Sequence, residues 1–169
     1  MKLHYKLLKS LKMLFGKKSL NAAETWASFG FNTHQDFWLF AVPIHLILQR
    51  DSFSMGEQLL LSDSESTNLI KTLNLHFQND AMQFYHYEKN WFLRLKHDPK
   101  IITVAPQTLI HEDIQAYLPT GVGASKWAKL TNEIQMLLFE HPVNVVRDNT
   151  QQPTINSLWF YGLGRINHD

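Results

Sequence analysis

Polar side chains that could do chemistry gather on one segment, NEIQMLLFEHPVN, which also carries a helical apolar pattern over residues 132–144. Asn132 and Gln135 are three residues apart, so they neighbour each other on one flank of a helix. Glu133 lies at the edge of the apolar face, and we expect its carboxylate to be partly buried. Such a carboxylate requires a partner, because its pKa otherwise rises.

Two arginines are the candidate partners of this carboxylate, Arg94 first and Arg147 second. In a structural interpretation, one of them pairs with Glu133. In a catalytic interpretation, both arginines bind a phosphorylated or other anionic small molecule by bidentate contacts. Glu133 or His45 then acts as the acid or base. The residues alone leave both interpretations open.

Asn144 lies two residues after Pro142 at the end of this segment, and Asn156 lies at the start of the last apolar run. Asparagine side chains bond readily to backbone groups, and a helix end leaves carbonyls without donors. We therefore expect the end of the helix, FEHPVN, to lie against the strand INSLWFYGLG, with both asparagines bonded to backbone groups at the junction. This polar lock is the structural alternative to a ligand pocket.

The strand INSLWFYGLG places the aromatic ring of Trp159 near Gly162 and Gly164. Glycine in a strand marks a close backbone approach or a bulge, and aromatic rings beside glycines suit a pocket wall. The alternative is a core strand whose rings pack under the helices. The hypothesis is thus a ligand site over residues 132–164 and its neighbours. The predicted ligand-binding residues are His45, Arg94, Asn132, Glu133, Gln135, Asn144, Arg147, Asn156, Trp159, Gly162 and Gly164.

Several chemistries are excluded or left without support by the sequence. The chain has no cysteine, which excludes disulfides, thiolate catalysis and cysteine-ligated metals. Its nine histidines form no H-x-H or H-E-x-x-H pattern, and no G-x-S-x-G or phosphate-binding glycine loop is present. GLG lacks the later glycine and following helix of a dinucleotide loop. We assign no catalytic residue and expect no metal and no cofactor.

The N-terminus differs from the rest of the 169-residue chain. Residues 2–15 are predicted to form a basic amphipathic helix, with its leucines on one face and its lysines on the other. It is either an interfacial membrane or partner contact, or a surface helix packed on the core. We predict two parts, residues 1–18 and a single domain over 19–169, and expect deletion of 1–18 to leave a folded domain. The net charge of +1 gives no reason to expect nucleic-acid binding, and no membrane span or signal peptide is evident, so we expect a cytoplasmic protein.

The remaining patterns predict an α+β domain. They indicate a helix over 21–28, a strand over 38–49, a helix over 63–77 that begins with a Ser62–Glu65 capping box, a hairpin of 82–87 with 91–96, a helix over 125–140 capped by Ser125 and ended by Pro142, and a strand over 155–164. IITVA is a further candidate strand, and DNTQQP reads as a turn. We expect an antiparallel or mixed sheet of about four to six strands, covered by two main helices.

Six blocks, VPIHLILQRD, LNLHF, WFLRLK, LPTG, NEIQMLLFEHPVN and INSLWFYGLG, resemble a family of uncharacterised proteobacterial cytoplasmic proteins. Members carry the label phosphoglycerate mutase-like or regulatory protein of a pathogenicity-factor type. The blocks match in order and spacing over residues 38–164. The positions on the motifs are His45, Asn74, His76, Trp91, Arg94, Pro119, Gly121, Asn132, Glu133, Gln135, Asn144, Asn156, Trp159, Gly162 and Gly164. Val42 replaces an aspartate of the pattern, and Tyr161 and Leu163 alter the last block.

The resemblance implies a family without an established activity, whose members continue past the glycine-rich block. We therefore expect this chain to be a short member or the recognition part of one. The residues alone do not support the mutase label, because we find no Ser or Thr nucleophile amid clustered Asp and His ligands. We favour a non-catalytic binding or regulatory module that recognises a protein or a small ligand through residues 132–164. The alternative is a phosphomutase- or hydrolase-like enzyme, which requires His45, Arg94, Glu133 and Asn156 to converge on one concave site.

Overall fold

The computed structural model describes residues 21–57 and 59–167. The helix predicted over residues 2–15 lies outside these ranges. The helices of the described part are α2 (Ala22–Ser28), α3 (Asp63–His76), α4 (Ala124–Phe139) and α5 (Pro142–Asn149), with 3₁₀ turns η1 (Pro106–Thr108) and η2 (Gln115–Tyr117). The strands are β1 (Phe37–Ile44), β2 (Leu46–Leu48), β3 (Phe53–Met55), β4 (Met82–Tyr87), β5 (Asn90–Leu95) and β6 (Ser157–Gly164).

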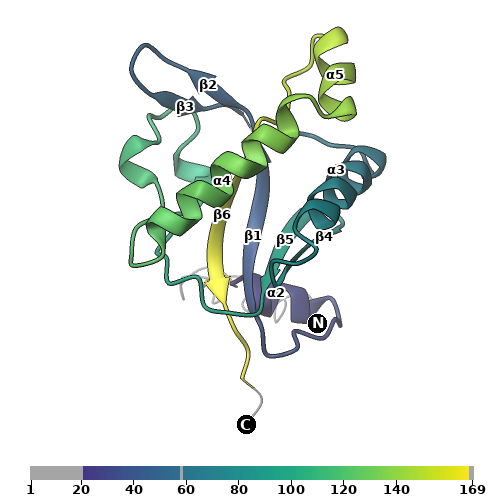
Figure 1. Cartoon of the computed structure of the whole chain (residues 1–169), viewed down its shortest axis with the longest axis vertical. Coiled ribbons are helices and arrows are strands. Elements are labelled where there is room, and N and C mark those ends of the chain that lie inside the picture. The colour runs from purple at the N-terminus through teal and green to yellow at the C-terminus, as the bar shows by residue number, and fades with distance from the viewer. Residues whose placement is uncertain (1–20, 58, 168–169) are drawn as a thin grey trace, which may run out of the picture.

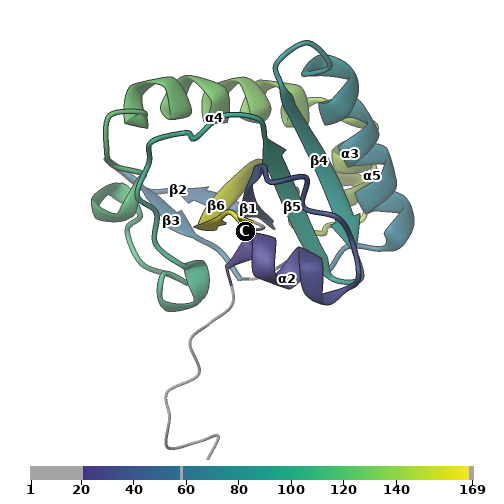
Figure 2. The same cartoon turned by 90° about the horizontal axis from the view of Figure 1, so that it is seen from below.

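A four-stranded sheet in the order β4-β5-β1-β6 forms the centre of the molecule, and all its neighbouring strands are antiparallel. Helices α3 and α4 cover one face of this sheet and α2 covers the other (Figures 1 and 2). Strands β2 and β3 pair separately as a small hairpin. The predicted α+β class, with an antiparallel sheet under two main helices, is confirmed.

Apolar side chains fill the space on both faces of the sheet. On one face, Leu69 and Leu73 of α3 and Ile134 of α4 are fully buried against the sheet. Their spacing follows the helical apolar stripes that the sequence shows. On the other face, Trp26 of α2 stacks on Trp38 of β1, with ring centroids 4.8 Å apart. Strand β1 is therefore packed by apolar side chains on both of its faces.

Four sequence-based expectations need correction. The strand predicted over 38–49 is two strands, β1 and β2, because the chain leaves the main sheet after Ile44. Ser125 does not cap α4, whose N-cap is Gly123 without a side-chain bond. Pro142 does follow the end of α4, but it also starts α5, where His141 is the N-cap and accepts from the N–H of Val143. Proline suits the first turn of a helix, because its missing N–H would be unsatisfied there. IITVA contributes an isolated bridge instead of a strand.

Candidate functional site

The two predicted asparagines bind backbone at the junction of the helices with the sheet. Asn144 is buried in α5, where its Nδ2 donates to the carbonyls of Leu138 at 2.8 Å and Ile155 at 2.7 Å, and its Oδ1 accepts from the N–H of Ile155 at 2.8 Å. Asn156 bonds Leu46 in the same manner, accepting from its N–H at 2.7 Å and donating to its carbonyl at 2.9 Å. The expected backbone bonding of both asparagines is confirmed. We call Asn144, Asn156 and these backbone partners the asparagine lock.

Arg147 is buried and holds α5 against the start of α3. Its Nε donates to the carbonyl of Pro153 at 2.7 Å, and its Nη1 lies 2.7 Å from the carboxylate of Glu65. Burial raises the pKa of Glu65, but the hydrogen bonds from the Ser62 backbone and from Arg147 outweigh it, so that the pKa lies below its ordinary value. Glu65 also completes the predicted capping box with Ser62. The guanidinium of Arg147 is thus engaged within the fold.

The predicted pairing of Glu133 with an arginine is wrong. The side chain of Glu133 is 51% exposed, and its Oε1 lies 2.6 Å from Nε2 of His76 at the end of α3. Arg94 instead donates to the carboxylate of Asp36, which Lys96 also contacts at 3.1 Å. Burial raises the pKa of Asp36, and the hydrogen bonds from Arg94 and Lys96 reverse this, so that its pKa is lowered. Glu133 needs no buried partner because it faces α3 and solvent and does not face the sheet.

The other predicted polar residues are dispersed. Nδ1 of His45 lies 2.8 Å from the carbonyl of Thr154. Gln135 donates to the hydroxyl of Ser157 at 3.1 Å, and Asn132 is exposed. His45 and Asn156 both lie where β1 passes into β2, whereas Arg94 binds Asp36 and Glu133 binds His76. These four residues do not converge on one concave site, which was the requirement of the catalytic interpretation.

The predicted site residues Trp159, Gly162 and Gly164 of β6 lie in close contact with other parts of the fold. Trp159 is buried and its Nε1 donates to the carbonyl of Val104 at 2.8 Å. Gly162 has φ +68°, and a Cβ there would lie 2.8 Å from the ring of Phe40. A Cβ at Gly164 would meet the side chain of Asn21 at 2.0 Å. Both glycines therefore mark close approaches, as expected, and the register of β1 against β6 also shifts in this part of the pair.

Two further properties of the described ranges bear on function. Among residues 21–57 and 59–167, no group of three or more His, Asp and Glu side chains is arranged to hold a metal ion. In the same ranges, no helix combines the length and the apolar character that a membrane crossing requires.

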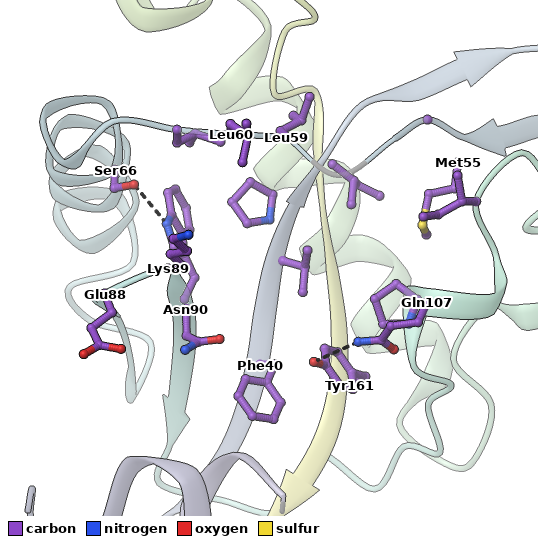
Figure 3. A pocket seen from close by; sticks show the side chains of 18 of the residues that line it. Phe40, Met55, Leu59, Leu60, Ser66, Glu88, Lys89, Asn90, Gln107 and Tyr161 are labelled. Carbon is purple, nitrogen blue, oxygen red and sulfur yellow. Dashed lines mark hydrogen bonds between the residues drawn. The ribbon is translucent and has the colours of Figure 1, made fainter. Parts of the chain in front are cut away.

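A cleft of about 890 Å³ opens where β1 and β5 separate. The two strands pair only from Phe37 to Phe40 of β1, and beyond Phe40 the strand β1 keeps β6 as its single partner in the sheet. Pro43 lies in this stretch, where its missing N–H removes a possible ladder bond. The end of β1 and the turn between β4 and β5 thus form the two sides of a wedge, which Figure 3 shows from close by.

The lining of the cleft is largely apolar and carries carboxylates at its border. The apolar side chains come from β1, β3, the 59–61 segment, β5, the η1 region and β6: Phe40, Val42, Pro43, Ile44, Met55, Leu59, Leu60, Leu61, Trp91, Pro106, Ile110 and Tyr161. Asp63 and Glu88 are the acidic lining residues, and Glu57 follows the lining residue Gly56. Lys89 is the one basic side chain among the lining residues that the structure describes. Figure 3 places Glu88 and Asn90 on the hairpin side and Gln107 and Tyr161 on the opposite side.

None of the eleven predicted ligand-binding residues lines this cleft. Of the 132–164 region, which was predicted to form the ligand site, Tyr161 is the residue that lines the cleft. Pro43 was the available sequence signal, because a proline inside an apolar strand indicates that pairing is lost on one side. Ligand binding by the eleven residues stays a prediction.

No protein-family model matches the chain. A probable 2,3-bisphosphoglycerate-independent phosphoglycerate mutase of Geobacter sulfurreducens is 27% identical over 125 residues, which cover 73% of this chain and 31% of that protein. The 2,3-bisphosphoglycerate-independent phosphoglycerate mutase of Methanosarcina barkeri is 27% identical over 107 residues, which cover 62% of this chain and 27% of that protein. The solved structure of the cofactor-independent phosphoglycerate mutase from Thermoplasma acidophilum superposes with a TM-score of 0.56 at 16% identity, over 79% of this chain and 38% of that one.

These matches support the label phosphoglycerate mutase-like. The residues alone had given that label no support. The chain spans less than a third of the length of the two curated relatives. Over most of its own length, it therefore has a phosphoglycerate mutase-like fold that corresponds to part of such an enzyme.

Proposed function

We propose that this chain is a non-catalytic recognition module, and that its cleft between the end of β1 and the β4–β5 turn binds a protein segment with apolar side chains and positive charge. The observation that carries the proposal is an apolar cleft with carboxylates at its border. Leu60 is 83% exposed at the cleft, which leaves apolar surface for a partner to cover. Asp63 and Glu88 are placed to meet cationic side chains of that partner.

An amphipathic helix fits this combination of surfaces. In the helix-in-groove mode of recognition, the apolar face of a helix lies in a groove, and its polar face keeps contact with the rim and with solvent. A small anion fits less well, since it would meet the two carboxylates of the cleft. Arg94 and Arg147, the arginines expected to bind such an anion, already bind Asp36 and Glu65.

The residues of the asparagine lock support a structural role for the 132–164 region. The side-chain amides of Asn144 and Asn156 are bonded to backbone on both their donor and acceptor sides. Recognition is therefore better supported at the cleft, to which this region contributes Tyr161.

A labelled peptide tests the proposal. The probe is a 14-residue helix of leucine and lysine with its leucines on one face, and the control peptide has the same composition in scrambled order. Fluorescence anisotropy is measured with the full chain and with its Leu7→Glu, Leu11→Glu variant, in which the leucine stripe of residues 2–15 is interrupted by two carboxylates. We expect the variant to bind the ordered peptide but not the scrambled one.

Surface variants locate the binding site of this probe. Leu60→Lys, made in the Leu7→Glu, Leu11→Glu chain, is expected to weaken binding about tenfold or more, because burying a leucine contributes about 1.5–3 kcal/mol. Met136→Lys is the matched control, since Met136 is a similarly exposed apolar residue on α4, a helix that contributes no residue to the cleft. Equal binding of both peptides, or equal effects of the two lysine variants, would contradict the proposal.

A second candidate is an enzyme that acts on a phosphorylated or other anionic small molecule. The names of the two relatives favour it, although the match covers only part of each. The full chain is assayed for interconversion of 2- and 3-phosphoglycerate with Mg²⁺ and Mn²⁺ present, and for a shift of its thermal midpoint with either compound. Turnover would support this candidate, and the absence of both turnover and a midpoint shift would count against it.

A further inference from the structure

The charges of this chain are separated along its length. Residues 1–18 contain six lysines and neither aspartate nor glutamate. Residues 21–167 contain ten lysines and arginines against fourteen aspartates and glutamates, a net charge of −4. The overall charge of +1 therefore combines the positive charge of a basic segment, residues 1–18, with the negative charge of an acidic body, residues 21–167. Opposite charges of this kind attract over roughly a Debye length, about 8–10 Å at ordinary ionic strength.

The body begins beside the cleft. Ala22 and Ala23, the first residues of α2, pack in one cluster with Phe40, which lines the cleft. The backbone nitrogen of Ala22 lies 3.7 Å from the position of a Cβ at Gly162, and Gly162 directly follows the lining residue Tyr161. In Figure 3, Phe40 and Tyr161 lie together at the same end of the cleft. Whatever precedes Asn21 thus starts near that end.

The basic segment is long enough to reach along the cleft. The predicted helix over residues 2–15 would be about 21 Å long, at 1.5 Å per residue. The five residues 16–20 between it and the body can span about 17 Å when extended. Its apolar stripe consists of Leu3, Leu7, Leu8, Leu11, Leu14 and Phe15. The leucines on one face match the apolar lining of the cleft, and the lysines on the other face match its carboxylates.

We propose that residues 2–15 of this chain bind in its own cleft, with the leucine stripe against the apolar lining and the lysines near Asp63 and Glu88. This inference rests on the proposed function and names the partner. An outside segment must then displace the chain's own segment, so that residues 2–15 act as an autoinhibitory contact. An anionic membrane is the less favoured site for this segment, because the acidic body would be repelled from the same surface.

Cross-linking of the full chain tests the contact, and the absence of native cysteine makes every introduced thiol unique. Leu7→Cys or Leu11→Cys is combined with Leu60→Cys at the cleft, or with Met136→Cys on α4 as the matched control. Disulfide formation under mild oxidation is followed by mass and by non-reducing electrophoresis. A docked segment holds its thiol at a high effective concentration, so we expect the Leu60→Cys pairs to close about tenfold faster than the control pairs. The product should be monomeric.

Each other outcome overturns the inference in a distinguishable way. Equal rates for the Leu60→Cys and Met136→Cys pairs would show that the segment does not dock in the cleft. A disulfide-linked dimer would show that the segment binds a second copy. If the full chain sediments with phosphatidylserine-containing vesicles and the Leu60→Cys pairs form no cross-link, the segment binds a membrane surface instead. If these tests fail while the Leu7→Glu, Leu11→Glu variant still binds the ordered probe peptide, the proposed function stands and only the autoinhibitory contact is wrong.

Discussion

Replacing Asn144 by alanine is the most direct test of the asparagine lock. The change removes the bonds to the carbonyls of Leu138 and Ile155 and the bond from the N–H of Ile155. The carbonyl of Leu138 still accepts from the N–H of His141 at 3.2 Å. The groups left without a partner are therefore the N–H and the carbonyl of Ile155, a residue with no exposed surface.

The expected loss is large compared with the stability of a domain. Each unsatisfied buried group costs about 1–3 kcal/mol, so Asn144→Ala should lower the free energy of unfolding by about 2–6 kcal/mol. Domains of this size are stable by about 5–15 kcal/mol. Asn156→Ala also frees two backbone groups, those of Leu46, but both residues are partly exposed and water can replace the amide. We expect about 1–3 kcal/mol for that variant.

Urea unfolding followed by tryptophan fluorescence measures these losses. Asn132→Ala is the control, because Asn132 is exposed, and its effect should stay within about 0.5 kcal/mol. An unchanged midpoint for Asn144→Ala would refute the lock. An unchanged midpoint for Asn156→Ala together with loss of a bound ligand would show that Asn156 belongs to a pocket.

Three further predictions follow from the charged and titratable groups. Arg147→Met should lower the free energy of unfolding by about 1–3 kcal/mol in urea titrations, because Glu65 and the carbonyl of Pro153 lose their donor. Glu133→Gln should change it by less than about 0.5 kcal/mol in the same assay, because the contact of Glu133 is half exposed. Burial lowers the pKa of His141 from its ordinary 6.5, so the unfolded state binds more protons, and stability should fall as the pH drops below 6.5. Thermal midpoints measured against pH check this. In His141→Gln, the loss of stability just below pH 6.5 should be absent. A second loss of stability at lower pH should remain, because Asp36 and Glu65, whose folded pKa values are lowered, become protonated there.

The sequence predicts elements whose signals are local. The capping box at Ser62 and the apolar stripe behind it lie within one stretch of chain, and α3 begins and ends within a residue of the predicted limits. Helix α5 was missed because Pro142 was read only as a stop, although the same proline is favourable at the first position of the next helix.

The site depends on contacts that sequence spacing does not give. The partners Arg94 and Asp36 are 58 residues apart, and Arg147 and Glu65 are 82 residues apart. Which carboxylate meets which arginine follows from the packing of whole elements, so the expected pairing with Glu133 failed. The cleft likewise arises from the point at which β5 stops pairing with β1, a property of the assembled sheet.

The position of β1 in the sheet has a consequence for how the chain reaches its folded state. Among the residues that the structure describes, β1 is the first strand, and one of its neighbours, β6, is the last. Joining them closes a loop of most of the described chain, which costs entropy and slows folding. Until β6 arrives, one edge of β1 is open to strands of other molecules. Refolding yield should therefore fall as protein concentration rises, since strand exchange between chains competes with the late arrival of β6.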